Sequence, residues 1–148
     1  MKPSVEDEAI IERFADALWV ERGLSRNTLM AYQTDLDKLV SWLIKDQQKN
    51  LVTAYKREVE GSQKAELYYS ILGKLNNHFL LEVNPVTGRP HQIRVQLGSM
   101  GCPIRGDLKY GFHKPNADAN INLHAREIVF EHPVKKEKMK ITSPVPEN

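Results

Sequence analysis

The first third of the chain spaces its apolar residues with the period of an α-helix. Ser4 and Asp7 form a start signal of the capping-box kind, and Gly23 is a favourable end residue. Between them, apolar residues recur at helical spacing: Ile10, Ile11, Phe14 and Leu18. We therefore predict a helix over about residues 5–21.

A second helical pattern follows Ser25, a residue type that caps helices well. Its apolar positions step by three, four, three and four residues: Leu29, Tyr32, Leu36, Leu39 and Leu43. Two amphipathic helices with a short connection between them form a helical hairpin. The sequence predicts such a hairpin within residues 1–44.

Beyond this point, short runs rich in aromatic and branched residues predict strands. Residues 66–72 and 78–83 are two such runs, and the polar connection 73–77 makes them an antiparallel pair. We expect loop or weak strand over 47–63, and further strands over 121–125, 127–132 and 138–141. From Gln92 onward the apolar residues fit a strand or a short helix that ends at Gly101.

Charge divides the chain in the same place. Residues 1–48 hold six Lys and Arg against nine Asp and Glu, a net charge of −3, whereas residues 49–148 hold fifteen against ten, a net charge of +5. This asymmetry indicates two units, 1–44 and 45–148, with different partners.

Four segments of the second unit carry a family resemblance. They are Thr-Gly-Arg-Pro-His-Gln-Ile-Arg-Val at 87–95, Pro-Ile-Arg-Gly-Asp-Leu-Lys-Tyr-Gly at 103–111, Leu-His-Ala at 123–125 and Phe-Glu-His-Pro at 130–133. In order and spacing, they resemble the carboxy-terminal part of the catalytic domain of RluA-type RNA pseudouridine synthases. The resemblance implies a short helix after Gln92, structured RNA as a partner and no cofactor.

In that family an arginine of this motif pairs with the catalytic aspartate, and the resemblance places this role on Arg94. It also places RNA-binding or pocket roles on Arg89, His91 and Gln92. The family's aspartate lies in an upstream His-Arg-Leu-Asp segment, and the 148 residues contain no such tetrapeptide. We therefore expect the chain to be inactive alone.

Without that aspartate, Arg94 needs another environment, because a buried unpaired charge is rarely tolerated. We predict that Arg94 is exposed or paired with Glu82 or Asp107. By the resemblance, Asp107 supports the fold and is not catalytic, and Tyr110 is a packing residue.

Residues 6–44 resemble part of the amino-terminal core-binding domain of Xer-type tyrosine recombinases, through Phe-Ala-Asp-Ala-Leu-Trp at 14–19 and Gly-Leu-Ser-Arg-Asn-Thr-Leu-Met-Ala-Tyr at 23–32. This resemblance makes the chain look chimeric. It implies an alternative DNA-binding role at a helix N-terminus for Ser25, Arg26, Asn27 and Thr28. The acidic charge of this segment disfavours nucleic acid.

The sequence gives little support for a metal site, an internal disulfide or a membrane span. His124 and His132 are eight residues apart near Glu131, without the close ligand pairs of a zinc site, so we expect no metal. The single cysteine, Cys102, cannot form an internal disulfide, which favours a cytoplasmic protein. No apolar run approaches the ~20 residues of a membrane span.

The expected fold class is α+β: an amino-terminal helical hairpin, then a mixed, mainly antiparallel sheet with a short helix. The expected function is that of an RNA pseudouridine synthase-like protein that binds structured RNA weakly and DNA less. The alternatives are a DNA-binding recombinase fragment, or a chimera with neither activity. We also expect exposed sheet edges, which a homo-oligomer would cover.

Overall fold

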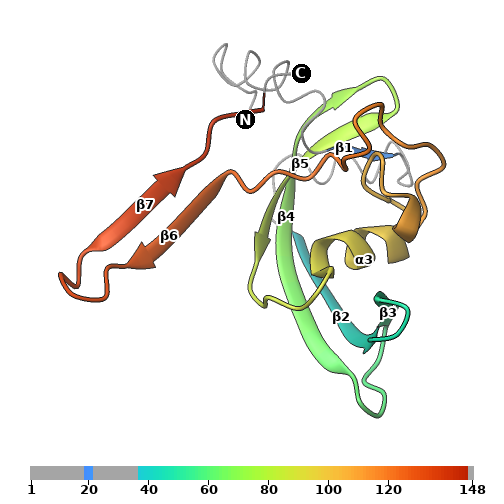
Figure 1. The fold of residues 1–148 in the computed structure, drawn as a ribbon, viewed down its shortest axis with the longest axis horizontal. Coiled ribbons are helices and arrows are strands. Elements are labelled where there is room, and N and C mark those ends of the chain that lie inside the picture. The colour runs from blue at the N-terminus through green and yellow to red at the C-terminus, as the bar shows by residue number, and fades with distance from the viewer. Residues whose placement is uncertain (1–18, 22–36, 147–148) are drawn as a thin grey trace.

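The computed structural model describes residues 19–21 and 37–146 (Figure 1). A five-stranded sheet has the strand order β1-β5-β4-β2-β3, and every neighbouring pair is antiparallel. Its strands are β1 (Trp19–Glu21), β2 (Asp37–Asp46), β3 (Leu51–Tyr55), β4 (Gln63–Leu75) and β5 (His78–Pro85). The helix α3 (Gln92–Ser99) and a 3-10 turn, η1 (Leu108–Tyr110), follow, and then the hairpin β6 (Glu127–Glu131) and β7 (Lys138–Thr142).

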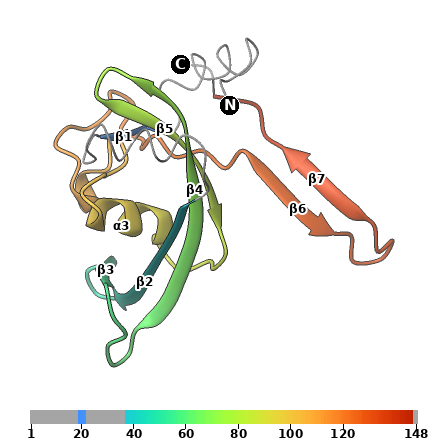
Figure 2. The same cartoon turned by 180° about the vertical axis from the view of Figure 1, so that it is seen from behind.

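The main core lies between the sheet and α3, which crosses one face of the curved sheet (Figures 1 and 2). Strand β4 alternates as a half-buried strand should, with Ala65, Leu67 and Tyr69 buried. Leu67 and Tyr69 belong to a cluster with Leu97 of α3, and Ala65 belongs to a smaller cluster with Val95. The helix therefore holds its position through apolar contacts along β4.

The predicted fold class, α+β with an amino-terminal helical hairpin, is wrong: the described residues form mostly antiparallel strands, with one α-helix. Residues 19–21 and 37–44, which we assigned to the two helices, lie in strands β1 and β2, which pair with β5 and with β3 and β4. The spacing misled because Leu39 and Leu43 are four residues apart, which places them on one side of a helix or of a strand. The other positions of the predicted hairpin lie outside the described residues.

Most of the strands and the helix predicted after residue 65 are present in the structure. The strand pair over 66–72 and 78–83 is confirmed, and both strands extend beyond the predicted limits as β4 and β5. The short helix after Gln92 and the strands over 127–132 and 138–141 are also confirmed. The strand over 121–125 is wrong, because that segment is irregular. Asn122 there donates its backbone N–H to Arg105 instead of joining a sheet.

The β6–β7 hairpin extends away from the sheet (Figures 1 and 2). Its register pairs Ile128 with Ile141 and Phe130 with Met139, so these four side chains share one face. All four are exposed, whereas the other face carries the ion pair of Lys140 and Glu127.

Candidate active site

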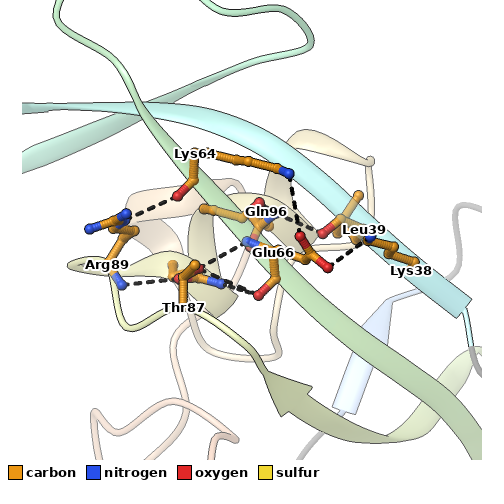
Figure 3. A network of polar contacts seen from close by, with 9 residues as sticks. Lys38, Leu39, Lys64, Glu66, Thr87, Arg89 and Gln96 are labelled. Atoms are coloured by element: carbon orange, nitrogen blue, oxygen red, sulfur yellow. Dashed lines mark hydrogen bonds and ion pairs between the residues drawn. The ribbon is translucent and has the colours of Figure 1, made fainter.

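The turn before α3 is tied to strand β4 by one buried amide. Gln92 Oε1 accepts hydrogen bonds from the Thr87 hydroxyl at 2.7 Å and the Arg89 backbone N–H at 3.0 Å. Its Nε2 donates to the Glu66 carbonyl at 3.0 Å. The Thr87 hydroxyl oxygen also accepts the Glu66 N–H at 2.9 Å. Figure 3 shows this network, which fixes the start of α3 on the sheet.

Charged groups surround the same part of β4. The Glu66 carboxylate pairs with Lys38 at 2.8 Å and lies 3.6 Å from Lys64 (Figure 3). The hydrogen bond and charge of Lys38 lower the pKa of Glu66. Arg89 Nε donates to the Lys64 carbonyl at 3.0 Å. The turn thus has a cationic outer side.

On the first turn of α3, Arg94 makes a bidentate pair with Asp107. Arg94 Nε donates to Oδ2 at 2.8 Å and Nη2 donates to Oδ1 at 2.9 Å. The Asp107 side chain is 1% exposed and that of Arg94 is 23% exposed. These hydrogen bonds raise the pKa of Arg94 above its usual value. The prediction that Arg94 pairs with Glu82 or Asp107 is confirmed for Asp107.

Tyr110 joins this pair to His91 and to strand β3. The Arg94 guanidinium lies over the Tyr110 ring, 5.0 Å from its centroid. The Tyr110 hydroxyl accepts the Val52 backbone N–H at 3.0 Å and lies 2.6 Å from His91 Nδ1. Three elements, α3, β3 and η1, therefore converge on one phenol.

His91 has an unusual backbone and a positive environment. It is the residue before α3, with φ 53° and ψ 17°, in the left-handed region that few non-glycine residues adopt. Partial burial, followed by the charges of Arg94, Lys109 and Lys45, lowers the pKa of His91. Partial burial and the nearby cations thus favour the neutral form of the ring.

The structure thus brings Arg94 and His91 together around Tyr110. The other predicted site residues that it describes, Gln92 and Arg89, have different surroundings. Gln92 is buried with both ends of its amide occupied, so it holds the turn in place. Arg89 lies on the outer side of the turn, against β4. Ser25, Arg26, Asn27 and Thr28 lie outside the described residues.

Sequence reasoning missed the contacts of two residues. Tyr110 does more than fill space, and Gln96 is fully buried, with Nε2 donating to Ser41 Oγ at 3.2 Å and to the Ala65 carbonyl at 3.3 Å. A glutamine within the apolar stripe of a short helix was the available signal. The partners of Tyr110 lie 19 and 58 positions away, and no local pattern marks them.

Two features are absent from residues 19–21 and 37–146. No group of three or more His, Cys, Asp or Glu side chains is placed to hold a metal ion there. No helix in that part of the chain is long and apolar enough to cross a membrane.

The pattern of the RNA pseudouridylate synthase family matches residues 15–99, more than half of the chain. The chain belongs to this family. Ribosomal large subunit pseudouridine synthase C of Vibrio cholerae is 38% identical over 103 residues, which cover 66% of this chain and 33% of that protein. The Haemophilus ducreyi protein of the same name is 39% identical over 106 residues, with the same coverage.

The fold agrees with solved structures of this group. Human RNA Pseudouridylate Synthase Domain Containing 1 superposes with a TM-score of 0.58 at 17% identity, over 93% of this chain and 57% of that one. Human RNA Pseudouridylate Synthase Domain Containing 4 gives 0.56 at 19% identity, over 94% and 61%. At these identities the likeness shows the fold alone.

The chain spans about a third of the length of the curated relatives named above. The match begins at residue 15, and strand β2 runs from Asp37 to Asp46, so both cross the predicted junction near residue 45. Residues on either side of that junction take part in the same strand.

Proposed function

We propose that this chain is the arginine-bearing part of an RNA pseudouridine synthase and that it makes no pseudouridine alone. The reaction breaks the N-glycosidic bond of uridine and rejoins the base through carbon, which requires a nucleophilic carboxylate. The observation that carries the proposal is Arg94, which lies within the matched family segment 15–99 and is held in a bidentate pair by Asp107.

Asp107 is a poor substitute for the missing nucleophile. Both of its carboxylate oxygens accept hydrogen bonds from Arg94, and its side chain is 1% exposed. A nucleophile needs an oxygen that faces the substrate. Asp107 therefore acts as the support that orients Arg94.

Arg94 keeps donor capacity for a further acid. Its Nε and Nη2 reach Asp107, while Nη1 makes no hydrogen bond within the described residues. The 23% exposure of the side chain leaves room for a carboxylate from another polypeptide segment. In this arrangement Asp107 and the incoming aspartate share one guanidinium.

RNA is the proposed partner, bound weakly and with strong salt dependence. The net charge of +5 over residues 49–148 supports this choice, as do the cations around His91. DNA binding by Ser25, Arg26, Asn27 and Thr28 is the less favoured alternative. The chimeric origin, the division near residue 45 and a homo-oligomer also remain predictions.

Mapping pseudouridine in ribosomal RNA after incubation with the full chain tests the proposal. After carbodiimide treatment, primer extension should show no stops beyond those in RNA that was incubated without the protein and treated in the same way. Adding a polypeptide that carries a His-Arg-Leu-Asp segment of the family tests the pairing role of Arg94, with Arg94→Ala as its control. Pseudouridine formation by the chain alone would overturn the proposed inactivity.

The partner proposal needs its own measurement. Affinity for a structured ribosomal RNA fragment and for a recombination-site duplex should be compared over a series of salt concentrations. We expect tighter binding of RNA, with log affinity falling by roughly 0.7–0.9 per neutralised phosphate for each unit of log salt. Equal affinity for both would contradict the RNA preference.

A further inference from the structure

The hydroxyl of Tyr110 has one proton and, within the described residues, two hydrogen-bonding neighbours, which decide where the proton goes. The Val52 backbone N–H is a donor, so the hydroxyl oxygen accepts that bond at 3.0 Å. The second neighbour is His91 Nδ1 at 2.6 Å. The hydroxyl proton finds its acceptor there, provided that Nδ1 carries no proton.

The opposite tautomer leaves a donor unused. If His91 Nδ1 were protonated, the Tyr110 oxygen would accept two hydrogen bonds, and its own proton would have no acceptor among the described residues. Hydrogen bonds are therefore satisfied best when the His91 ring carries its proton on Nε2.

The surroundings hold both rings in this geometry. The His91 and Tyr110 rings meet edge to face with centroids 5.6 Å apart. The backbone of Tyr110 lies against α3 so closely that a Cβ on Gly98 would be 2.5 Å from its carbonyl oxygen. The His91 side chain makes no capping bond to the helix, so Nδ1 is available to the phenol.

We propose that Tyr110 is a positioning residue that holds His91 as the Nε2–H tautomer, so that Nε2–H is a neutral donor to an oxygen atom of bound RNA. The RNA contact rests on the proposed function, whereas the tautomer does not. Nε2 makes no hydrogen bond within the described residues and is not an enclosed atom. It lies on the residue next to Gln92 at the start of the helix that carries Arg94.

The charged groups around the ring favour the same state. Arg94 from α3, Lys109 from η1 and Lys45 from β2 each disfavour a proton on His91, and Asp107 acts in the opposite sense. A neutral donor suits this place because a further positive charge would meet three others.

Nitrogen NMR of the full chain labelled with ¹⁵N-histidine tests the tautomer. At neutral pH, His91 should show an unprotonated Nδ1 and a protonated Nε2, and His91→Asn assigns its signals by removing them. Tyr110→Phe should mix the two tautomers and raise the His91 pKa by roughly half a unit or more, because the neutral ring loses one hydrogen bond. Tyr55→Phe, which alters an exposed tyrosine of β3, should match the wild type.

A wild-type His91 with its proton on Nδ1, or with both tautomers equally populated, would overturn the proposal, even if Tyr110→Phe failed to fold. The RNA contact is tested by adding a structured ribosomal RNA fragment. We expect the His91 Nε2 signal to shift in the wild type and to shift less in Tyr110→Phe. An unchanged signal at saturation would refute the RNA contact, whereas a failure to bind RNA at all would count against the proposed function and leave the tautomer standing.

Discussion

Arg94 and Asp107 connect α3 to the segment before η1 through two parallel hydrogen bonds of 2.8 and 2.9 Å. The two partners differ in environment, since the Asp107 side chain is 1% exposed and the Arg94 side chain is 23% exposed. Removal of the arginine would leave a buried carboxylate with no ion-pair partner among the described residues. The pair therefore couples the candidate active site to the stability of the fold.

Arg94→Ala should lower the free energy of unfolding by about 2–4 kcal/mol, less than for a fully buried pair because Arg94 is partly exposed. Urea denaturation measures the change. Arg89→Ala is the matched control, with an expected loss below about 1 kcal/mol, because the Arg89 side chain makes one hydrogen bond, to a backbone carbonyl.

A double-mutant cycle separates the pair from its surroundings. Arg94→Ala combined with Asp107→Ala should lose less than the sum of the single changes, since neither charge is then left alone. Additive losses would show that the two side chains act independently.

Gly98→Ala should also destabilise the chain, although alanine normally favours a helix interior by about 1 kcal/mol over glycine. The new Cβ would lie 2.5 Å from the Tyr110 carbonyl oxygen and 3.2 Å from the Tyr110 Cβ. We expect a loss of about 1–3 kcal/mol from the forced separation of α3 and η1. Gly88→Ala has nothing within 4 Å of its Cβ and should change stability by less than about 0.5 kcal/mol. Similar melting temperatures for the two variants would refute the close approach.

Local patterns predicted the middle of the fold well. Strands β4 and β5 are rich in aromatic and branched residues, and they turn at Asn76, a residue type that tolerates its φ of 53°. Strand β2 was missed because its leucines are four residues apart, a spacing that fits the period of a helix and that of a strand. What decides between them is pairing with β3 and β4, and that information lies elsewhere in the chain.

The candidate site was also predicted only in part. Arg94 and its pairing with Asp107 followed from the family resemblance and from the rule that buried charges are compensated. The role of Gln92 did not, because an amide in a motif fits a ligand contact as well as a structural one. Only the fold shows that Glu66, 26 positions away, occupies its nitrogen.

Gln92→Glu tests that structural role. A carboxylate can still accept from Thr87 and Arg89, but its second oxygen would face the Glu66 carbonyl oxygen, so that two acceptors meet where a donor and an acceptor meet now. We expect a loss of about 1–3 kcal/mol, because the hydrogen bond to Glu66 is lost and the new carboxylate oxygen is buried without a donor. Gln63→Glu, at an exposed position of β4, provides the control and should be nearly neutral. If both changes had the same small effect, the buried amide would not be what holds the turn.

The pH dependence of stability should report the neutral state of His91. Its pKa in the folded chain is lowered from the usual 6.5, so the unfolded chain takes up a proton at a higher pH than the folded chain does. Stability should therefore fall as the pH drops through 6.5 toward the folded pKa, and this contribution should level off below it. His91→Asn removes the titrating ring, and asparagine tolerates the left-handed backbone. Urea denaturation of both proteins over a pH series gives a difference curve in which the other groups cancel. That curve should slope through the weakly acidic range, with the wild type losing more on acidification. A flat difference, or a wild type that gains stability as His91 becomes protonated, would show that the ring is not held neutral in the folded protein.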